Sequence, residues 1–378
     1  MSLLQEGQII RGTWEIERKL GEGAFAEVFR VRHQIFGRQA MKVFKTVGMT
    51  LEKTKALLSE AAILSSLSHR NVIRVFEANT TETSAGICGF FTMELVSGGS
   101  LDDFWRSHGN SFMPVPDAVE VVRQVCRGLA IAHGQNPPII HRDIKPQNIL
   151  VGYDSEGLHV RVSDFGLAKQ VNPLTLRASA RGTPAFKAPE VFTERGQDSC
   201  LCDVWAVGTT LYLLLSDRFP YAESPDEDLS DPRRFKRELL RPSKVNALVD
   251  AELDRIASKC LAMNPKDRYP TARELLLDLE KWRPKAARPS RGEPSAPDVS
   301  KAALGDYTPA DAGKAEAMAK EAVRLARSLG NLAEAAGLLE CALNECPPPP
   351  RKVRKDAEEL AAWSRHVTAP ATDNPRRR

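Results

Sequence analysis

The chain has 378 residues, of which 42% are hydrophobic and 27% are charged, and its 53 basic and 49 acidic side chains give a net charge of +4. At about 150 residues per domain, this length predicts two or three domains. The composition excludes a collagen-like or wholly disordered chain. The charge is too evenly balanced to indicate a nucleic-acid-binding protein, which needs a concentrated basic face.

Three features bear on the compartment in which the protein works. The longest apolar stretch, residues 204–215, is too short for a membrane span, which needs about twenty residues. Residues 1–11 lack the basic and then apolar pattern of a signal peptide. The seven cysteines are scattered without metal-site spacing, which indicates reduced thiols. These features predict a cytoplasmic protein without a membrane span.

Changes in composition along the chain predict its domain organisation. A long segment that alternates apolar runs with turn signals is followed by one rich in Pro, Ser, Ala and Arg, which predicts a linker. Alanine and leucine then recur at helical spacing, interrupted by four consecutive prolines. The predicted boundaries are 13–283 for a folded domain (13–96 and 97–283 for its two parts), 284–309 for the linker, 310–366 for a helical segment and 367–378 for a disordered tail.

Within the folded domain, apolar residues alternate at first and later follow a helical period. The predicted strands are 15–20, 27–32, 38–44, 72–77 and 90–95. Residues 50–67 interrupt them with a period of 3.6, which predicts one helix among the strands. The predicted later helices are 101–106, 115–133, 203–216, 250–261 and 271–281. A strand-rich half followed by a helix-rich half predicts an α+β fold with two lobes.

Residues 20–31 read LGEGAFAEVFRV, with Gly21 and Gly23 closely spaced. Glycines let the backbone approach a phosphate, because no side chain blocks the amides. Ala26 stands where a third glycine would complete the G-x-G-x-x-G pattern. Taken alone, the segment fits a phosphate-binding loop or a plain hairpin.

Lys42 lies on the apolar strand QAMKVF, where an ammonium group is costly unless it meets an anion. Glu60, on the following helix, is a natural partner that would hold the ammonium in place for the phosphates of a nucleotide. The alternative is an edge-strand lysine whose side chain reaches water.

Residues 139–150, IIHRDIKPQNIL, put Asp143, Lys145 and Asn148 on one loop between apolar segments. A carboxylate, an ammonium and an amide oxygen suit hydroxyl orientation, stabilisation of phosphate charge and metal ligation. Asp164 follows in VSDFGLA and supplies a second oxygen ligand. Because Mg²⁺ prefers hard oxygen ligands, Asn148 and Asp164 are the predicted metal ligands. Ordinary loop polarity is the alternative.

Together these motifs resemble those of eukaryotic-type (Hanks-type) serine/threonine protein kinases over residues 13–283. The strings APE (188–190), DVWAVG (203–208) and NPKDRYPTARELL (264–276) complete the resemblance. It implies a two-lobed protein kinase fold, with a β-rich N-lobe that carries one main helix and an α-helical C-lobe. It also implies ATP- and Mg²⁺-dependent phosphoryl transfer to protein Ser and Thr hydroxyls, and autophosphorylation of the activation loop.

The resemblance assigns roles to individual residues. Asp143 would accept or orient the substrate hydroxyl proton, Lys145 would steady the transferring phosphate, and Thr183 would reach both. Lys42 would contact the α- and β-phosphates, with Glu60 as its partner. The other residues implied to bind ATP are Leu20, Gly21, Glu22, Gly23, Ala24, Phe25, Val28, Ala40, Met93, Glu94, Val96, Leu150 and Asp164.

Some of these roles concern the adenine and the joining of the lobes. Met93 would be the gatekeeper, and the backbone of Glu94 and Val96 would meet the adenine edge. Arg268 would pair with Glu190 in the helical lobe. The residues implied to stack as an internal column between the lobes are Leu64, Val75, His141 and Phe165.

The form of the loop motifs resembles the serine/threonine branch, because Lys145 in HRDIKPQN and the string GTPAFKAPE are typical of it. The short inserts and the Ala- and Arg-rich linker resemble bacterial members. Arg142 is available to pair with a phosphate on Thr175 or Ser179 of the activation loop. The alternative is that both are plain solvated hydroxyls.

Two other functions remain open on the sequence. One is a nucleotide-binding scaffold, or pseudokinase, that acts through its C-terminal helices. The other is a small-molecule kinase of related fold, which the complete activation segment ending in APE disfavours.

Residues 328–347 resemble the second helix of a tetratricopeptide repeat, and the preceding residues supply a first helix. A single repeat cannot bury its apolar face, since about three are normally needed. The expected roles are docking of a partner protein or of a second copy of the chain. The alternatives are a helical hairpin packed on the folded domain and a flexible tail.

Overall fold

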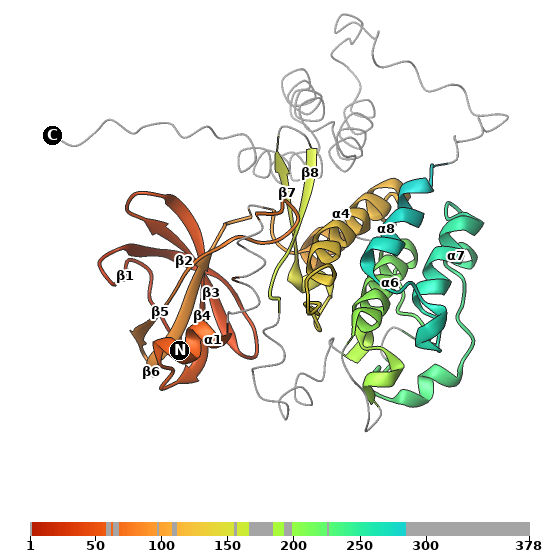
Figure 1. Cartoon of the computed structure of the whole chain (residues 1–378). Coiled ribbons are helices and arrows are strands. Elements are labelled where there is room, and N and C mark those ends of the chain that lie inside the picture. The colour runs from red at the N-terminus through yellow and green to blue at the C-terminus, as the bar shows by residue number, and fades with distance from the viewer. Residues whose placement is uncertain are drawn as a thin grey trace, which may run out of the picture. The chain divides into compact units, whose positions relative to one another are not determined.

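A computed structural model describes residues 2–57, 62, 68–96, 98–107, 112–154, 157–165, 184–192, 199–224 and 227–284 (Figure 1). The chain divides into two compact units, one of residues 1–152 and 159–282 and the other of residues 153–158 and 283–378. The predicted linker beyond residue 284, the helical segment and the tail lie outside the described residues.

The first half of the larger unit is a six-stranded antiparallel sheet in the order β1-β2-β3-β4-β6-β5 (Figure 1). Its strands are β1 (Ile9–Ile10), β2 (Trp14–Glu22), β3 (Ala26–His33), β4 (Gly37–Val47), β5 (Val75–Thr83) and β6 (Gly86–Met93). Each predicted strand is present, and β1 is an addition. The predicted strand 72–77 begins only at Val75, because Val72 bridges Val162 and the amide of Ile73 donates to the carbonyl of Val162.

Alternation along β3, β4 and β6 gives the sheet two different faces. One face carries a buried cluster in which Phe29, Val31, Met41 and Phe90 pack with residues from the N-terminus. The opposite face carries a second cluster, which includes Ala26, Ala40 and Met93. Lys42 lies two residues beyond Ala40 and therefore points to this second face. Helix α1 (Leu51–Leu57) packs against β5 and β6.

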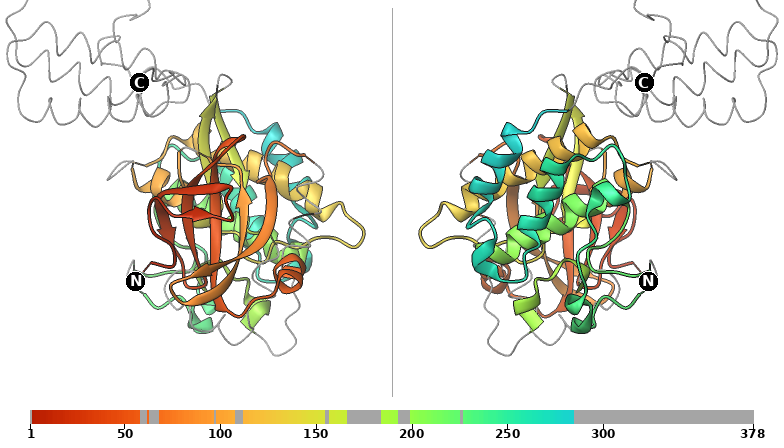
Figure 2. Two further views of the ribbon diagram at one scale, coloured as in Figure 1. Left: turned by 90° about the vertical axis from the view of Figure 1, so that its left-hand side faces the viewer. Right: turned by 90° about the vertical axis from the view of Figure 1, so that its right-hand side faces the viewer.

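Helices form the second half of the larger unit. They are α3 (Leu101–Arg106), α4 (Val115–His133), α6 (Cys200–Ser216), α7 (Ala251–Cys260) and α8 (Ala272–Lys281). Capping boxes start two of them, from Ser100 with Asp103 and from Thr271 with Glu274, which explains why the predicted starts of α3 and α8 agree with the structure to within a residue. Helix α4 packs on α6 and α8, and α6 packs on α7 (Figure 2).

A two-stranded hairpin brings the predicted motifs back to one place. Strand β7 (Ile149–Asp154) starts directly after the 3-10 turn η1 (Pro146–Asn148), and β8 (Gly157–Val162) ends two residues before Asp164. The hairpin therefore returns Asp164 to the loop that carries Asp143. Short 3-10 turns, η3 (Pro184–Phe186), η4 (Pro189–Phe192), η5 (Pro232–Lys236), η6 (Pro242–Lys244) and η7 (Pro265–Asp267), complete the C-terminal half.

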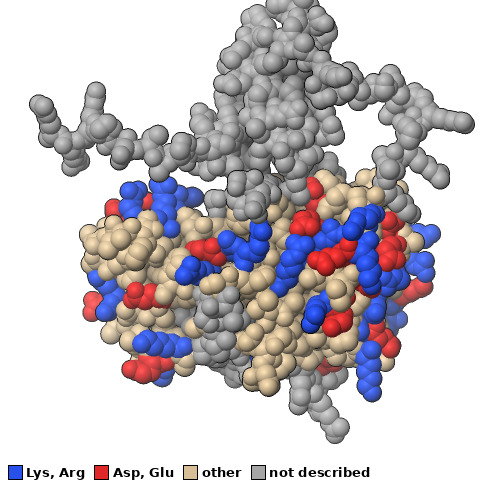
Figure 3. All heavy atoms as spheres, turned by 45° about the horizontal axis from the view of Figure 1, so that its top comes forward, with Lys and Arg blue, Asp and Glu red and all other residues tan. Residues whose placement is uncertain are grey.

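Two predictions made from composition concern the distribution of surface charge and the presence of a membrane span. On the face seen in Figure 3, Lys and Arg residues are interspersed with Asp and Glu residues. Among the described helices, none combines the length and the apolar character that crossing a bilayer requires.

Candidate functional site

Asp143, Lys145 and Asn148 form one hydrogen-bonded group on the loop before β7. Lys145 Nζ lies 2.7 Å from Asp143 Oδ2. The side-chain amide of Asn148 donates to the same carboxylate at 2.9 Å and to the carbonyl of Asp143 at 2.8 Å. The predicted carboxylate, ammonium and amide are thus brought together, and the carboxylate is held between two donors.

The loop is anchored from beneath by Asp203, on the first turn of the buried helix α6. Its carboxylate, 1% exposed, accepts hydrogen bonds from the amides of His141 at 2.7 Å and Arg142 at 2.9 Å, and His133 Nε2 lies 3.1 Å from it. Burial alone would raise the pKa of Asp203, but the hydrogen bond and charge of His133 lower it. Asp203 lies in the DVWAVG motif, but its anchoring contacts were not predicted from the sequence.

His141 joins the loop to the segment that carries Asp164. Its Nδ1 accepts from the amide of Asp143 at 3.3 Å and its Nε2 lies 2.7 Å from the carbonyl of Ser163, so the partners require the neutral tautomer with hydrogen on Nε2. Burial lowers the pKa of His141, which favours the same neutral form. Its ring packs on Phe165, with centroids 4.5 Å apart. Of the predicted column, His141 and Phe165 are therefore in contact.

Lys42 reaches across from β4 to Asp164. Its Nζ lies 2.6 Å from Asp164 Oδ2, and the two side chains are 16% and 19% exposed. The ammonium thus meets an anion and does not reach out to water. Asp164 has a φ of 64° and Arg142 a φ of 71°, in the left-handed region that non-glycine residues rarely adopt. Such conformations persist only where surrounding contacts enforce them, and they concentrate at functional sites.

The residues present fit a hard divalent cation. The amide nitrogen of Asn148 donates to Asp143, so its oxygen Oδ1 is the atom of this side chain that a cation would take. Lys42 contacts Asp164 through Oδ2, so Oδ1 of this carboxylate is the second oxygen that a cation would take. One carboxylate and one amide oxygen, with water and phosphate oxygens, satisfy Mg²⁺.

The predicted adenine pocket is an apolar cluster on the face of the sheet that carries Lys42. Its predicted members that pack together are Val28, Ala40, Met93, Val96 and Leu150. Leu20 is 40% exposed and is not part of this cluster. The amide of Glu94 donates to the carbonyl of Arg74 at 2.9 Å, which leaves the carbonyl of Glu94 as the group that could meet an adenine edge.

The glycine-rich loop is the turn between β2 and β3. Gly21 and Glu22 end β2, and Gly23, Ala24 and Phe25 form the turn, with the amide of Gly23 bonded to the carbonyl of Ala26 at 2.8 Å. The backbone of the segment is therefore a β-hairpin whose turn is the glycine-rich loop.

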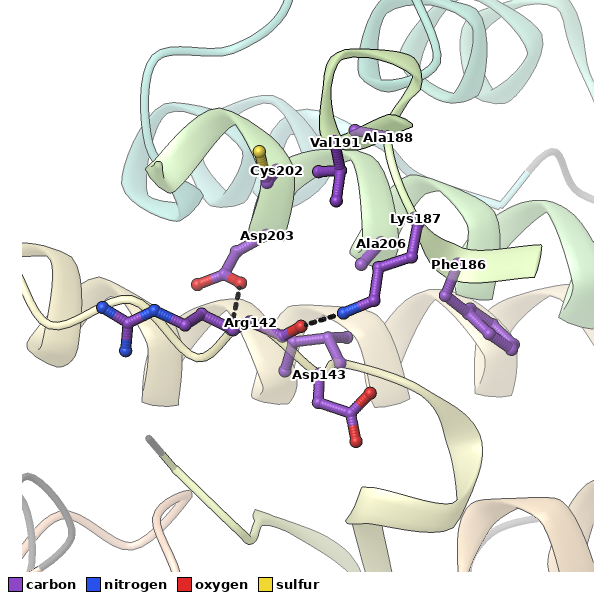
Figure 4. Close-up of a pocket in the computed structure, with 10 residues that line it drawn as sticks. Arg142, Asp143, Phe186, Lys187, Ala188, Val191, Cys202, Asp203 and Ala206 are labelled. Carbon is purple, nitrogen blue, oxygen red and sulfur yellow. Dashed lines mark hydrogen bonds between the residues drawn. The ribbon is translucent and has the colours of Figure 1, made fainter. Parts of the chain in front are cut away.

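A pocket opens beside Asp143 on the side of α6 (Figure 4). It is lined by Arg142, Asp143, Ile144, Phe186, Lys187, Ala188, Val191, Cys202, Asp203 and Ala206. Lys187 points into it and donates to the carbonyl of Arg142 at 2.6 Å. Burial raises the pKa of Cys202 to about 11, so its thiol stays protonated at neutral pH. Lys187 lies in the GTPAFKAPE motif, but its contact with the loop was not predicted from the sequence.

Arg268 and Glu190 pair as the resemblance implies. The guanidinium makes two hydrogen bonds to the carboxylate, of 2.6 and 2.8 Å, and lies over the Trp205 ring at 4.7 Å. Glu60, Leu64, Thr175, Ser179 and Thr183 lie outside the described residues.

Comparison with known proteins agrees with this geometry. Residues 14–278 match the protein kinase domain family. The chain belongs to the protein kinase family. Members of this family use ATP, typically with Mg²⁺, and their fold has a β-sheet N-lobe and a helical C-lobe, as the two halves of the larger unit do.

Several curated relatives of this chain are named as protein kinases, and some of them as serine/threonine-protein kinases. CBL-interacting protein kinase 19 of Oryza sativa subsp. japonica is 32% identical over 292 residues, covering 75% of this chain and 53% of the relative. Serine/threonine-protein kinase DCLK3 of Mus musculus is 34% identical over 270 residues, covering 70% and 32%. Serine/threonine-protein kinase PknB of Mycobacterium leprae is 34% identical over 224 residues, covering 58% and 34%. The matched part thus spans about a third to a half of the length of these relatives.

Proposed function

We propose that this protein is a serine/threonine protein kinase that transfers the γ-phosphate of ATP to Ser and Thr hydroxyls of proteins. The observation that carries the proposal is the hydrogen-bonded group of Asp143, Lys145 and Asn148, together with the Lys42–Asp164 ion pair. Every charged group that phosphoryl transfer needs has its expected residue type, which favours an enzyme over a scaffold.

In this proposal Asp143 receives or orients the proton of the attacking hydroxyl. Its carboxylate is held by the amide of Asn148 and the ammonium of Lys145, so it is positioned before substrate binds. Lys145 shares its charge between Asp143 and the transferring phosphate. Thr183 is proposed to contact both groups.

Nucleotide binding is assigned to the two sheet strands that flank the loop and to β4. The glycine-rich turn, made of Gly21, Glu22, Gly23, Ala24 and Phe25, is proposed to lie over the phosphates. The adenine is proposed to lie among Leu20, Val28, Ala40 and Leu150, beside Met93 and the backbone of Glu94 and Val96. Lys42 is proposed to contact the α- and β-phosphates, with Glu60 as a further partner.

Asn148 and Asp164 are proposed to hold Mg²⁺. The ion would neutralise part of the charge that develops on the transferring phosphate. Asp164 is presented for this role by its left-handed backbone conformation and by Lys42, which fixes one carboxylate oxygen.

The acceptor class is tested by incubating the protein with Mg·ATP and a protein lysate and locating the phosphates by mass spectrometry. We expect phosphoserine and phosphothreonine in substrates and in the activation loop, at Thr175 or Ser179. Arg142 is the proposed partner of that loop phosphate. Phosphate found only on tyrosine, or only on small molecules, would contradict the proposal.

The proposal extends to the regions beyond the catalytic domain. We propose domain boundaries at 13–283, 284–309, 310–366 and 367–378, with the tetratricopeptide-like helices binding a partner protein or a second copy. The Ala- and Arg-rich linker supports a bacterial origin. The five described cysteines are free thiols, which supports a reducing compartment such as the cytoplasm. A chain that ends after Trp282 and keeps its oligomeric state and its phosphorylation of a physiological partner would contradict the role of the helices.

A further inference from the structure

A buried carboxylate stands at the base of the glycine-rich loop. Glu27 is the second residue of β3, directly opposite Glu22 of β2, and its side chain is 3% exposed. Its Oε2 accepts from the hydroxyl of Ser2 and from the amide of Leu3, both at 2.9 Å, and its Oε1 lies 3.0 Å from Lys19 Nζ. Three donors from two separate segments thus converge on one carboxylate.

The donors Ser2 and Leu3 belong to an N-terminal segment (residues 2–4) that is itself fixed at a second point. The carbonyl of Ser2 accepts from the Ser84 hydroxyl at 3.0 Å, and the carbonyl of Leu3 accepts from the Ser84 amide at 3.1 Å. Leu3 and Leu4 are 8% and 2% exposed and pack with Phe29, Val31, Met41 and Phe90. This cluster lies on the face of the sheet opposite Lys42 and is called the rear cluster below. The segment therefore ties the base of the loop to the turn between β5 and β6.

The charges around Glu27 are arranged to keep it ionised. Glu22 and Glu27 are cross-strand partners whose like charges would repel, and Lys19 contacts both, at 2.6 and 3.0 Å. Glu22 also pairs with Lys45 of β4 at 2.5 Å. Burial alone would raise the pKa of Glu27, but the amide of Leu3 and the ammonium of Lys19 lower it. The carboxylate is therefore charged at neutral pH, and it is costly to leave without its donors.

We propose that Glu27 is a positioning residue that sets the affinity for ATP by clamping the N-terminal segment (residues 2–4) onto the strand that leaves the glycine-rich loop. The inference rests on the proposed phosphate-binding role of that loop. Glu27 lies on the face of β3 opposite Val28, so it acts on the nucleotide through the loop and does not touch it. If the base of the loop is loosened, the loop must become ordered when ATP binds, and the entropy lost in that ordering lowers the affinity for ATP.

The same geometry means that a change at Ser2 could break the contact between the N-terminal segment (residues 2–4) and Glu27. A negative charge on its oxygen would stand within hydrogen-bond distance of the Glu27 carboxylate, in a site that already holds two carboxylates. Such a charge disrupts by repulsion. Ser2→Asp is therefore expected to act in the same direction as loss of Glu27.

The test measures the dissociation constant of Mg·ATP, the steady-state constants, and hydrogen exchange of the amides of residues 21–27 without nucleotide. For Glu27→Ala we expect the Kd and the KM for ATP to rise about tenfold, with kcat within about twofold of wild type. Exchange in the loop is expected to accelerate. Glu27→Gln keeps an oxygen that can accept from Leu3 and Ser2, so its Kd for ATP is expected to lie between those of wild type and Glu27→Ala.

Two control variants separate positioning from general stability. Glu15→Ala removes an exposed carboxylate of β2, and Val31→Ala opens a cavity in the rear cluster farther along β3. Neither is expected to change the Kd for ATP, although Val31→Ala lowers stability. An equal rise of the Kd in Val31→Ala and Glu27→Ala, or unchanged loop exchange in Glu27→Ala, overturns the inference. A wild-type protein that binds no Mg·ATP overturns the proposed function instead, and the exchange measurement still decides the clamp.

Discussion

At the scale of single residues, the site is defined by side chains that lie far apart in the sequence. Lys42 and Asp164 are 122 positions apart, yet their charged atoms are 2.6 Å from each other. The two side chains are 16% and 19% exposed, so both remain partly accessible to solvent.

Replacing either member of this pair is expected to abolish phosphoryl transfer while the protein stays folded. In Lys42→Met and Asp164→Ala, kcat/KM should fall by about a thousandfold or more, because catalysis here depends on positioning and charge stabilisation. Activity is measured with labelled ATP, and folding by circular dichroism and thermal unfolding. Either variant keeping more than about a tenth of the wild-type turnover would contradict its assigned role.

At the scale of elements, the helical half is locked by the ion pair between Glu190 of η4 and Arg268, next to η7. The guanidinium side chain is fully buried and also donates to the carbonyls of Ala262 at 2.8 Å and Leu201 at 3.2 Å. One side chain thus joins the end of the activation segment, the start of α6 and the loop after α7. Because the guanidinium is fully buried, replacing Glu190 leaves a buried charge without its ion-pair partner, which is expected to lower the free energy of unfolding by up to about 3–5 kcal/mol.

The same pair predicts a pH dependence of stability. Burial alone would raise the pKa of Glu190, but the hydrogen bonds from Arg268 lower it below its ordinary value. A carboxyl group with a lowered folded pKa stabilises the protein above its unfolded pKa, and this stabilisation is lost as the pH falls through the folded value. The difference in unfolding free energy between wild type and Glu190→Gln should therefore be full at pH 7 and shrink below about pH 4.

Denaturant unfolding at a series of pH values measures this difference. Glu15→Gln, an exposed carboxylate on β2, is the control and should show no comparable trend. A Glu190→Gln effect of the same size at pH 7 and pH 3 would show that the ion pair does not contribute through its charge.

At the scale of the whole molecule, the folded unit closes at Trp282, four residues beyond the family match. Its side chain is 5% exposed, and the indole donates to Asp250 at 3.1 Å. Arg123 of α4 donates to the carbonyls of Leu279 at 2.6 Å and Trp282 at 2.9 Å. The last turn of α8 and Trp282 are therefore part of the core.

Two truncations test this boundary. A chain that ends after Trp282 should unfold within about 2 °C of the full chain, whereas one that ends after Asp278 should lose about 10 °C or more, because burial of a tryptophan contributes several kcal/mol. Thermal unfolding measures both. Equal unfolding temperatures for the two truncated chains would place the domain boundary before α8 ends.

Local patterns predicted much of this molecule, and long-range contacts decided the rest. The bounds of α3 and α4 follow from helical period and end signals, and alternation put Lys42 on the apolar strand that carries the site. The clamp at Glu27 was not predicted, because residues 2–4 have no periodicity and the partner is over twenty positions away. The contacts of Asp203 were likewise not predicted, because they depend on the packing of α6 against the loop that carries Asp143. The spacing of residues in the sequence does not show from which backbone amides a buried carboxylate will accept hydrogen bonds.

The most direct test of the central claim compares wild type with Asp143→Asn in the presence of γ-labelled ATP and Mg²⁺. The substitution keeps the size of the side chain and removes the charge that is proposed to receive or orient the hydroxyl proton. We predict label on protein Ser and Thr with the wild type, and incorporation lower by about a thousandfold or more with the variant. Equal incorporation by the two proteins would contradict the assignment of this chain as an active kinase.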